Sequence, residues 1–114
     1  MHLKTKPVKK ILDEFYYIDL PKEFTRHPAS RKDGTKFRKQ FLEPFYQDKT
    51  DDSKIFVSLD EVDGYSTAFL KAAFVELAVK YGVDKVSRRL HFVTKEDPLL
   101  AEEVEHYVKE AVTI

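Results

Sequence analysis

Two adjacent hydroxyl side chains, Ser66 and Thr67, stand where a run of turn residues gives way to a helical apolar pattern. Each hydroxyl could act as a nucleophile, or could cap the helix by accepting a hydrogen bond from a free N–H in its first turn. The serine elbow of hydrolases, G-x-S-x-G, is incomplete because Ala68 occupies the place of the second glycine. We therefore predict a helix cap at Ser66 or Thr67. Both are also candidate phosphorylation sites, since the helix dipole and free amides stabilise an added phosphate.

Three carboxylates, Asp60, Glu61 and Asp63, lie just before the hydroxyl pair and follow a predicted strand. Open α/β sheets place their ligand sites at such strand ends, where carboxylates can perform acid–base chemistry or bind a cation. No nucleophile or base stands at a fixed spacing from them. Turn formation and surface charge are therefore the simpler interpretation of this cluster.

Several classes of site lack the residues that they need. The chain has three glycines, so neither G-x-G-x-x-G nor a phosphate-binding P-loop can be written. The histidines are scattered and there is no cysteine, so we expect no metal site and no disulfide. The lack of cysteine also fits a reducing compartment, and we expect a cytoplasmic protein.

The charges cancel over the whole chain but are unevenly distributed, with positive charge dominating residues 1–40 and negative charge the rest. Such asymmetry can mark faces that meet a charged partner. Since no recognition motif or aromatic platform accompanies the basic residues, we do not expect nucleic-acid binding. No apolar run approaches the length of a bilayer-spanning helix, so we expect no membrane association. The oligomeric state is left open.

The apolar pattern places these residues among alternating strands and helices. Strands are predicted at 14–20, 54–62 and 86–93, with an irregular loop over 21–34. The strand at 54–62 is expected to be central and covered on both sides, because Phe56 makes its second face partly apolar. The predicted helices are one that begins near Asp33 or Thr35 and is ended by Pro44 near position 42, one over 66–81 that Gly82 ends, and one that starts at Asp97.

This order of elements predicts one small α/β domain, a mixed β-sheet packed with about three helices. We assign residues 1–10 to a flexible N-terminal segment and residues 11–114 to the domain.

Two stretches carry a family resemblance. "KIFVSLDEVDGYSTAFLKAAFVELAVKYG" resembles the central strand, loop and helix of STAS domains, the anti-sigma factor antagonist fold, and most closely the bacterial STAS-like domain family of unknown function. "PASRKDGTKFRKQFLEPF" is similar to the P-x-x-R…G…F-R…L-x-P segment of that family. The resemblance implies a small sheet flanked by helices that has no cofactor and acts by protein contact.

In STAS antagonists the strand-to-helix loop docks on a kinase-like anti-sigma partner, and phosphorylation of a serine at the helix start breaks the complex. The resemblance places the loop's acid, serine and phospho-acceptor serine on Ser66, Thr67 and Ala68. Because alanine cannot take a phosphate, Thr67 or Ser66 would have to serve instead.

We therefore predict a non-catalytic regulatory module that binds a protein partner, with an ATPase of the histidine-kinase type as the candidate. The contact is expected in the loop 60–69. Its predicted partner-binding residues are Asp63, Gly64, Tyr65, Ser66, Thr67, Ala68 and Phe69. The alternative is a small enzyme or anion-binding domain that uses Asp60, Asp63 and Ser66, with Arg31 and Arg38 as anion binders.

Overall fold

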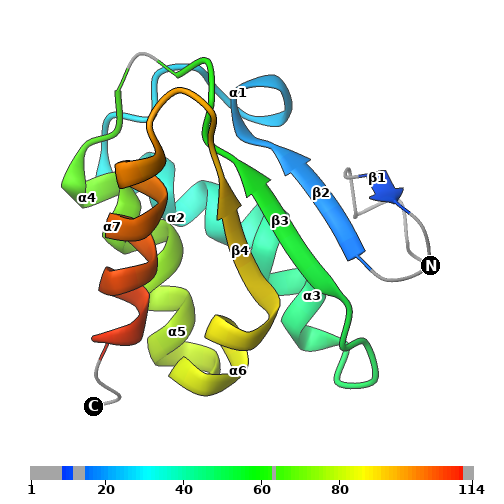
Figure 1. Cartoon of the computed structure of the whole chain (residues 1–114). Coiled ribbons are helices and arrows are strands. Elements are labelled where there is room, and N and C mark those ends of the chain that lie inside the picture. The colour runs from blue at the N-terminus through cyan, green and yellow to red at the C-terminus, as the bar shows by residue number, and fades with distance from the viewer. Residues whose placement is uncertain (1–8, 12–14, 63, 112–114) are drawn as a thin grey trace.

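The computed structural model describes residues 9–11, 15–62 and 64–111. They form a four-stranded sheet in the order β1-β2-β3-β4, in which β2, β3 and β4 are parallel and β1 runs antiparallel to β2 (Figure 1). The strands are β1 (Lys9–Ile11), β2 (Phe15–Asp19), β3 (Lys54–Ser58) and β4 (Leu90–Val93). The predicted α/β class and the single domain are confirmed, and β3 is central between two parallel neighbours.

The described residues form five helical units, more than the three expected. Two of these units are longer helices that each contain a wider π-helical turn in the middle. The units are α1 (Leu20–Glu23); α2 (Arg31–Phe37), η2 (Arg38–Leu42) and α3 (Glu43–Gln47); α4 (Thr67–Leu70), η3 (Lys71–Val75) and α5 (Glu76–Tyr81); α6 (Val83–Arg89); and α7 (Pro98–Lys109). The two extra units, α1 and α6, span four and seven residues, too few to display a helical period in the sequence.

The first long helix differs from its prediction at both ends. It starts at Arg31, inside the predicted loop, because the Ser30 hydroxyl caps it by accepting the Asp33 N–H. Pro44 does not end the helix, which continues to Gln47. A proline ring clashes with the preceding turn of a regular helix, and here that turn is the π turn η2. We infer that the wider turn accommodates the ring.

The predicted strand at 86–93 was wrong in its first half. The segment up to Arg89 belongs to α6, and only Leu90–Val93 forms a strand. Val86 lies in α6 and its side chain is fully buried. A buried apolar residue is expected in a strand as well as in a helix, so Val86 did not distinguish the two in the sequence. The predicted strand at 54–62 is likewise shorter and ends at Ser58.

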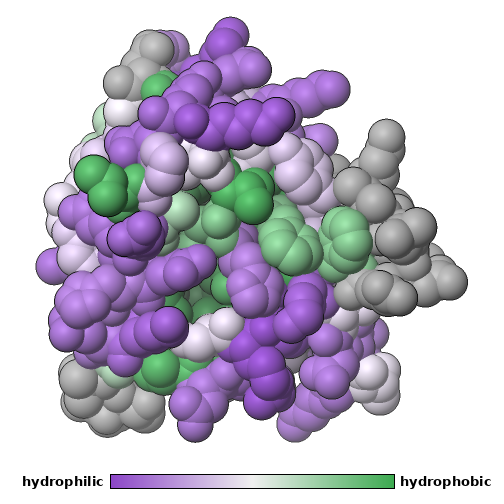
Figure 2. Space-filling view, viewed as in Figure 1, coloured by the Kyte–Doolittle hydropathy of each residue, from purple (hydrophilic) through white to green (hydrophobic). Residues whose placement is uncertain are grey.

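The described helices cover one face of the sheet. Tyr16, Ile18, Ile55 and Val57 are buried on the covered face, whereas the alternate residues of β2 are partly exposed. In the view of Figure 1, α2 and α3 lie behind the sheet and α7 lies beside β4. Contrary to the expectation for β3, the described helices do not cover its second face. Figure 2 shows the uncovered face, with apolar surface gathered at its centre.

Gly34 sets how closely the two long helices approach. A methyl group on its Cα would lie 2.5 Å from the carbonyl oxygen of Phe69 and 2.8 Å from the Cβ of Ala72. Real Cβ atoms essentially never come so close, so α2 passes α4 and η3 at backbone contact. This close crossing positions the helix that follows the candidate loop.

Candidate functional site

The connection after β3, which contains the candidate loop, is braced by its two neighbours at the carboxyl ends of the parallel strands. On one side, Arg26 forms an ion pair with Glu61 at 3.4 Å, and the Ser66 N–H donates to the Pro28 carbonyl at 3.4 Å. On the other side, the Glu61 N–H donates to Glu96 Oε1 at 2.9 Å. Polar contacts therefore join the described residues of the connection to the neighbouring loops on both sides.

The Asp60 side chain is hydrogen-bonded to the loop that follows β4. Its carboxylate accepts hydrogen bonds from the Thr94 hydroxyl and from the backbone N–H groups of Lys95 and Glu96. The hydrogen bond from Thr94, followed by those from the two amides, holds the pKa of Asp60 below its ordinary value. An ionised carboxylate with these donors already in place orders a turn, as the sequence suggested for this cluster.

Ser66 is the helix cap, and Thr67 is the exposed neighbour. Ser66 Oγ accepts the Phe69 N–H at 3.0 Å, which confirms one of the two predicted caps. Thr67 is exposed, and its side chain reaches Tyr107 of α7, whose hydroxyl donates to Glu103 Oε2 at 3.0 Å. Phosphorylation at either hydroxyl stays a prediction.

The other residues of the loop 60–69 divide between surface and core. Gly64 and Ala68 are exposed, whereas Tyr65 is half-buried and donates its hydroxyl to the Leu59 carbonyl at 3.2 Å. Burial raises the pKa of the Tyr65 phenol above its ordinary value. Phe69 is fully buried in the core, so its side chain is not part of the exposed surface of the loop. Asp63 lies outside the described residues.

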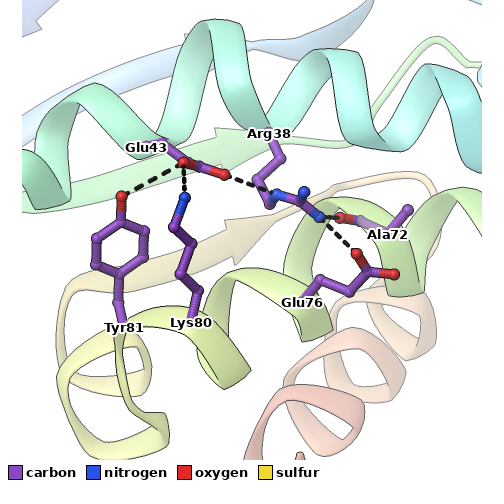
Figure 3. A network of polar contacts seen from close by, with 6 residues as sticks. All are labelled: Arg38, Glu43, Ala72, Glu76, Lys80 and Tyr81. Carbon is purple, nitrogen blue, oxygen red and sulfur yellow. Dashed lines mark hydrogen bonds and ion pairs between the residues drawn. The ribbon is translucent and has the colours of Figure 1, made fainter.

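Arg31 and Arg38, the predicted anion binders, meet at one carboxylate of α5. Figure 3 shows the Arg38 side of this contact. The two oxygens of Glu76 accept from Arg31 Nη1 at 2.6 Å and from Arg38 Nη1 at 2.9 Å. Arg38 also donates from Nε to Glu43 Oε2 at 2.9 Å and is 8% exposed. Its charge is thus already compensated by two carboxylates within the fold. Anion binding by Arg31, which is exposed, stays a prediction.

Glu43 extends this network to the end of α5. It is 4% exposed, and its Oε1 accepts from Lys80 Nζ at 2.8 Å and from the Tyr81 hydroxyl at 3.4 Å (Figure 3). Burial alone would raise the pKa of Glu43, but the hydrogen bonds from Lys80 and Arg38 outweigh it and hold that pKa below its ordinary value. Sequence reasoning missed Glu43, Glu76 and Lys80, because charged residues on a helix are ordinarily read as surface.

The sequence model of the STAS-like domain of unknown function (DUF4325) matches residues 33–99, which is more than half of the chain. The chain belongs to this family. No curated protein and no solved structure matches it. The matched range of this STAS-like domain includes Gly34, Arg38, the braced loop and the Ser66 cap, and leaves out Arg31.

A second buried arginine of the STAS-like domain lies at the amino ends of the strands. Arg89 is 2% exposed and donates from Nε to the Ser53 carbonyl at 2.7 Å and from Nη1 to the Phe45 carbonyl at 3.0 Å. Its Nη2 lies 3.7 Å from Asp51 Oδ1, and its guanidinium carbon lies 4.8 Å from the centre of the Tyr46 ring. The arginine therefore ties α6 to the connection between α3 and β3.

Asp51 joins Arg89 to the sheet through Tyr16. The Tyr16 hydroxyl donates to Asp51 Oδ2 at 2.7 Å. Burial would raise the pKa of Asp51, but hydrogen bonds from Ser53 and Tyr16 and the charge of Arg89 lower it to about 2. Burial, and then the bond to Asp51, raises the pKa of Tyr16 to about 12. The geometry gives this cluster a structural role.

Two further properties concern only the part of the chain that the structure describes. It contains no group of three or more His, Cys, Asp or Glu residues that could hold a metal ion. It also contains no helix long and apolar enough to cross a membrane.

Proposed function

We propose that this STAS-like domain is a non-catalytic interaction module that binds a protein partner through the start of α4. The docking surface consists of Gly64, Thr67 and Ala68, with Tyr65 beside them. The observation that carries the proposal is the state of the loop after β3, which is braced from both sides yet leaves these three residues exposed. A surface that is already ordered loses little conformational entropy when a partner binds.

The side chains that could perform chemistry near this surface are engaged elsewhere. Asp60 accepts three donors from the loop after β4, and Ser66 caps α4. Arg38 is paired with Glu43 and Glu76. A catalytic site would need a nucleophile and a base free to face a substrate. These contacts favour docking over the alternative of an enzyme or an anion-binding domain.

A hollow beside the docking surface supports contact with a side chain of the partner. It has a volume of about 340 Å³ and lies between α4 and α7. Leu59, Leu70 and Leu100 contribute its apolar lining, and Glu96 and Glu103 contribute carboxylates. Concave sites of this size hold one or two side chains, and the acidic lining favours a basic one.

The partner class follows from the family resemblance. We propose an ATPase of the histidine-kinase type, the class that STAS antagonists bind. Ala68 occupies the place of the phospho-acceptor serine, so Thr67 is the hydroxyl through which we propose that the contact is regulated. Tyr107 places the Glu103 carboxylate near Thr67. A phosphate on Thr67 would carry nearly two negative charges, and Glu103 would repel that phosphate.

Site-specific photo-crosslinking in cells tests the proposal. A photoreactive amino acid replaces Ala68 in one variant and Gln40, an exposed residue of η2, in the control variant. We expect position 68 to give one crosslinked protein, identified by mass spectrometry as an ATPase of this type, and position 40 to give none. Equal adducts at the two positions, or none at position 68, would rule out docking through α4.

A further inference from the structure

The uncovered face of the sheet carries a row of contacting rings. The register places Tyr17 of β2 beside Phe56 of β3, and Phe56 beside His91 of β4. Phe15 packs edge-to-face on Phe56 with ring centres 5.1 Å apart, and His91 stacks on Phe56 at 5.2 Å. These side chains are half-buried, and Val93, next to them on the same face, is 39% exposed. This set is the open face.

The open face is hollowed along β4. A depression of about 560 Å³ runs between the sheet and α7, and Tyr17, Val93 and Ala101 are among its lining residues. Near the other end of β4, the buried His91 Nε2 has no hydrogen-bond partner among the described residues. A contiguous apolar surface of this kind is typical of a surface that another molecule covers.

The charges on the open face are arranged in a self-complementary way. Among the described residues of β2, β3 and β4 that point to this face, the charged ones are Lys54 at the amino end and Asp19 at the carboxyl end. Lys54 pairs in register with Phe15, and Asp19 with Ser58. The two charges therefore lie about 13 Å apart along the strands, at the usual rise of a strand, with the ring row midway between them.

We propose that a second copy of this chain packs on the open face. The two sheets meet face to face with antiparallel strands, about a two-fold axis that runs across the strands at the row of Tyr17, Phe56 and His91. This axis sets ring against ring and brings Lys54 of each copy to Asp19 of the other. Face-to-face sheets pack about 10 Å apart, a spacing that interdigitated aromatic side chains fill.

The charge pattern favours a second copy over other occupants. The described charged side chains of β2, β3 and β4 on the open face are one positive and one negative, whereas a nucleic acid or an anionic membrane surface requires an excess of positive charge. Because Lys54 and Asp19 lie on opposite sides of the two-fold axis, the axis places each of them opposite its counterpart in the other copy and gives two symmetric ion pairs. Thr67 and Ala68 belong to α4, in the helical layer, so the pairing does not depend on the proposed docking function.

Sedimentation velocity over a wide concentration range tests the pairing, with circular dichroism as the check on folding. We expect the wild-type chain to sediment at twice its monomer mass of 13.4 kDa. Val93→Glu should raise the dimer dissociation constant at least about tenfold, because each copy would bury an unpaired carboxylate. Leu99→Glu is the matched control, since Leu99 is the other exposed large apolar residue among those that the structure describes and is 73% exposed on α7. It should leave the dimer unchanged.

A charge exchange tests the proposed axis. Lys54→Glu and Asp19→Lys should each weaken the dimer, and the double variant should restore it, because the two ion pairs re-form with reversed signs. A wild-type chain that stays monomeric would overturn the proposal. A monomer whose Phe56 region is nevertheless protected from hydrogen exchange would assign the open face to another part of the same chain, and a dimer that survives both Val93→Glu and Lys54→Glu would place the interface elsewhere.

Discussion

Arg38 of one long helix donates a 2.6 Å hydrogen bond to the carbonyl of Ala72 in the π turn of the other. The π turn makes this carbonyl available, because the Glu76 N–H bonds to Lys71 and not to Ala72 as in a regular α-helix. Arg38 itself begins the π turn of its own helix. The two widened turns are thus joined by one buried guanidinium.

Replacing Arg38 should destabilise the fold strongly. Arg38 is the cation that Glu43 and Glu76 share, and Arg38→Met removes it. Removing one partner of a buried ion pair lowers the free energy of unfolding by about 3–5 kcal/mol. Lys80 still compensates Glu43, so we expect about 3 kcal/mol in chemical denaturation. Arg31→Met is the control, because Arg31 binds the same Glu76 from an exposed position and should cost less than about 1 kcal/mol. Equal losses for the two variants would contradict a structural role for Arg38.

Gly34 should not tolerate even a methyl group. Gly34→Ala places a Cβ 2.5 Å from the Phe69 carbonyl oxygen, and overpacking of this kind costs about 1–3 kcal/mol. Thr35→Ala, at the next position of α2, should change the free energy of unfolding by less than about 0.5 kcal/mol. The thermal unfolding midpoints of the two variants measure the difference. A Gly34→Ala protein as stable as the wild type would show that the helices can move apart freely.

The hydroxyl pair should separate into a structural and a surface member. Ser66→Ala removes the hydrogen bond from the Phe69 N–H and should cost about 1 kcal/mol. Thr67→Ala should cost less than about 0.5 kcal/mol, because Thr67 is exposed. Denaturation of the two single variants is the measurement, and the reverse order of stabilities would mean that Thr67 is the cap.

Features that depend on contacts between residues close in the sequence could be predicted from it, whereas features that depend on long-range contacts could not. The cap at Ser66, the stop at Gly82 and the start at Asp97 were predicted correctly, because each depends on contacts within one helical turn. The start of the first helix was missed, because the Ser30 cap lies among prolines and charged residues that are typical of loops. Pro44 was predicted to end the helix, because no local sequence pattern indicates the π turn that precedes it.

The long-range contacts were beyond prediction from the sequence for a different reason. Arg38, Glu76 and Arg89 are charged residues on helices, and only the crossing of the helices buries them. The family resemblance indicated the braced loop but not its contacts, since Arg26 and Glu96 lie about 35 residues on either side of Glu61.

Stability should fall in acid because of Asp51. Its pKa is lowered to about 2 in the folded state, so its contribution is complete above the ordinary carboxyl pKa and is lost as the pH falls through about 4 to about 2. Allowing for partial solvent screening, the loss should be about 1–2 kcal/mol. The free energy of unfolding against pH should be flatter in this range for Asp51→Asn than for the wild type. Asp52→Asn, at the exposed neighbouring position, should keep the wild-type slope.

The affinity of the Ala68→Arg variant for the ATPase captured by crosslinking at position 68 tests the docking surface most directly. Ala68 is exposed, so the variant should keep the wild-type free energy of unfolding. We predict that calorimetric titration will show at least about tenfold weaker binding, because the larger side chain obstructs the contact. An unchanged affinity in the folded variant would contradict docking through Thr67 and Ala68.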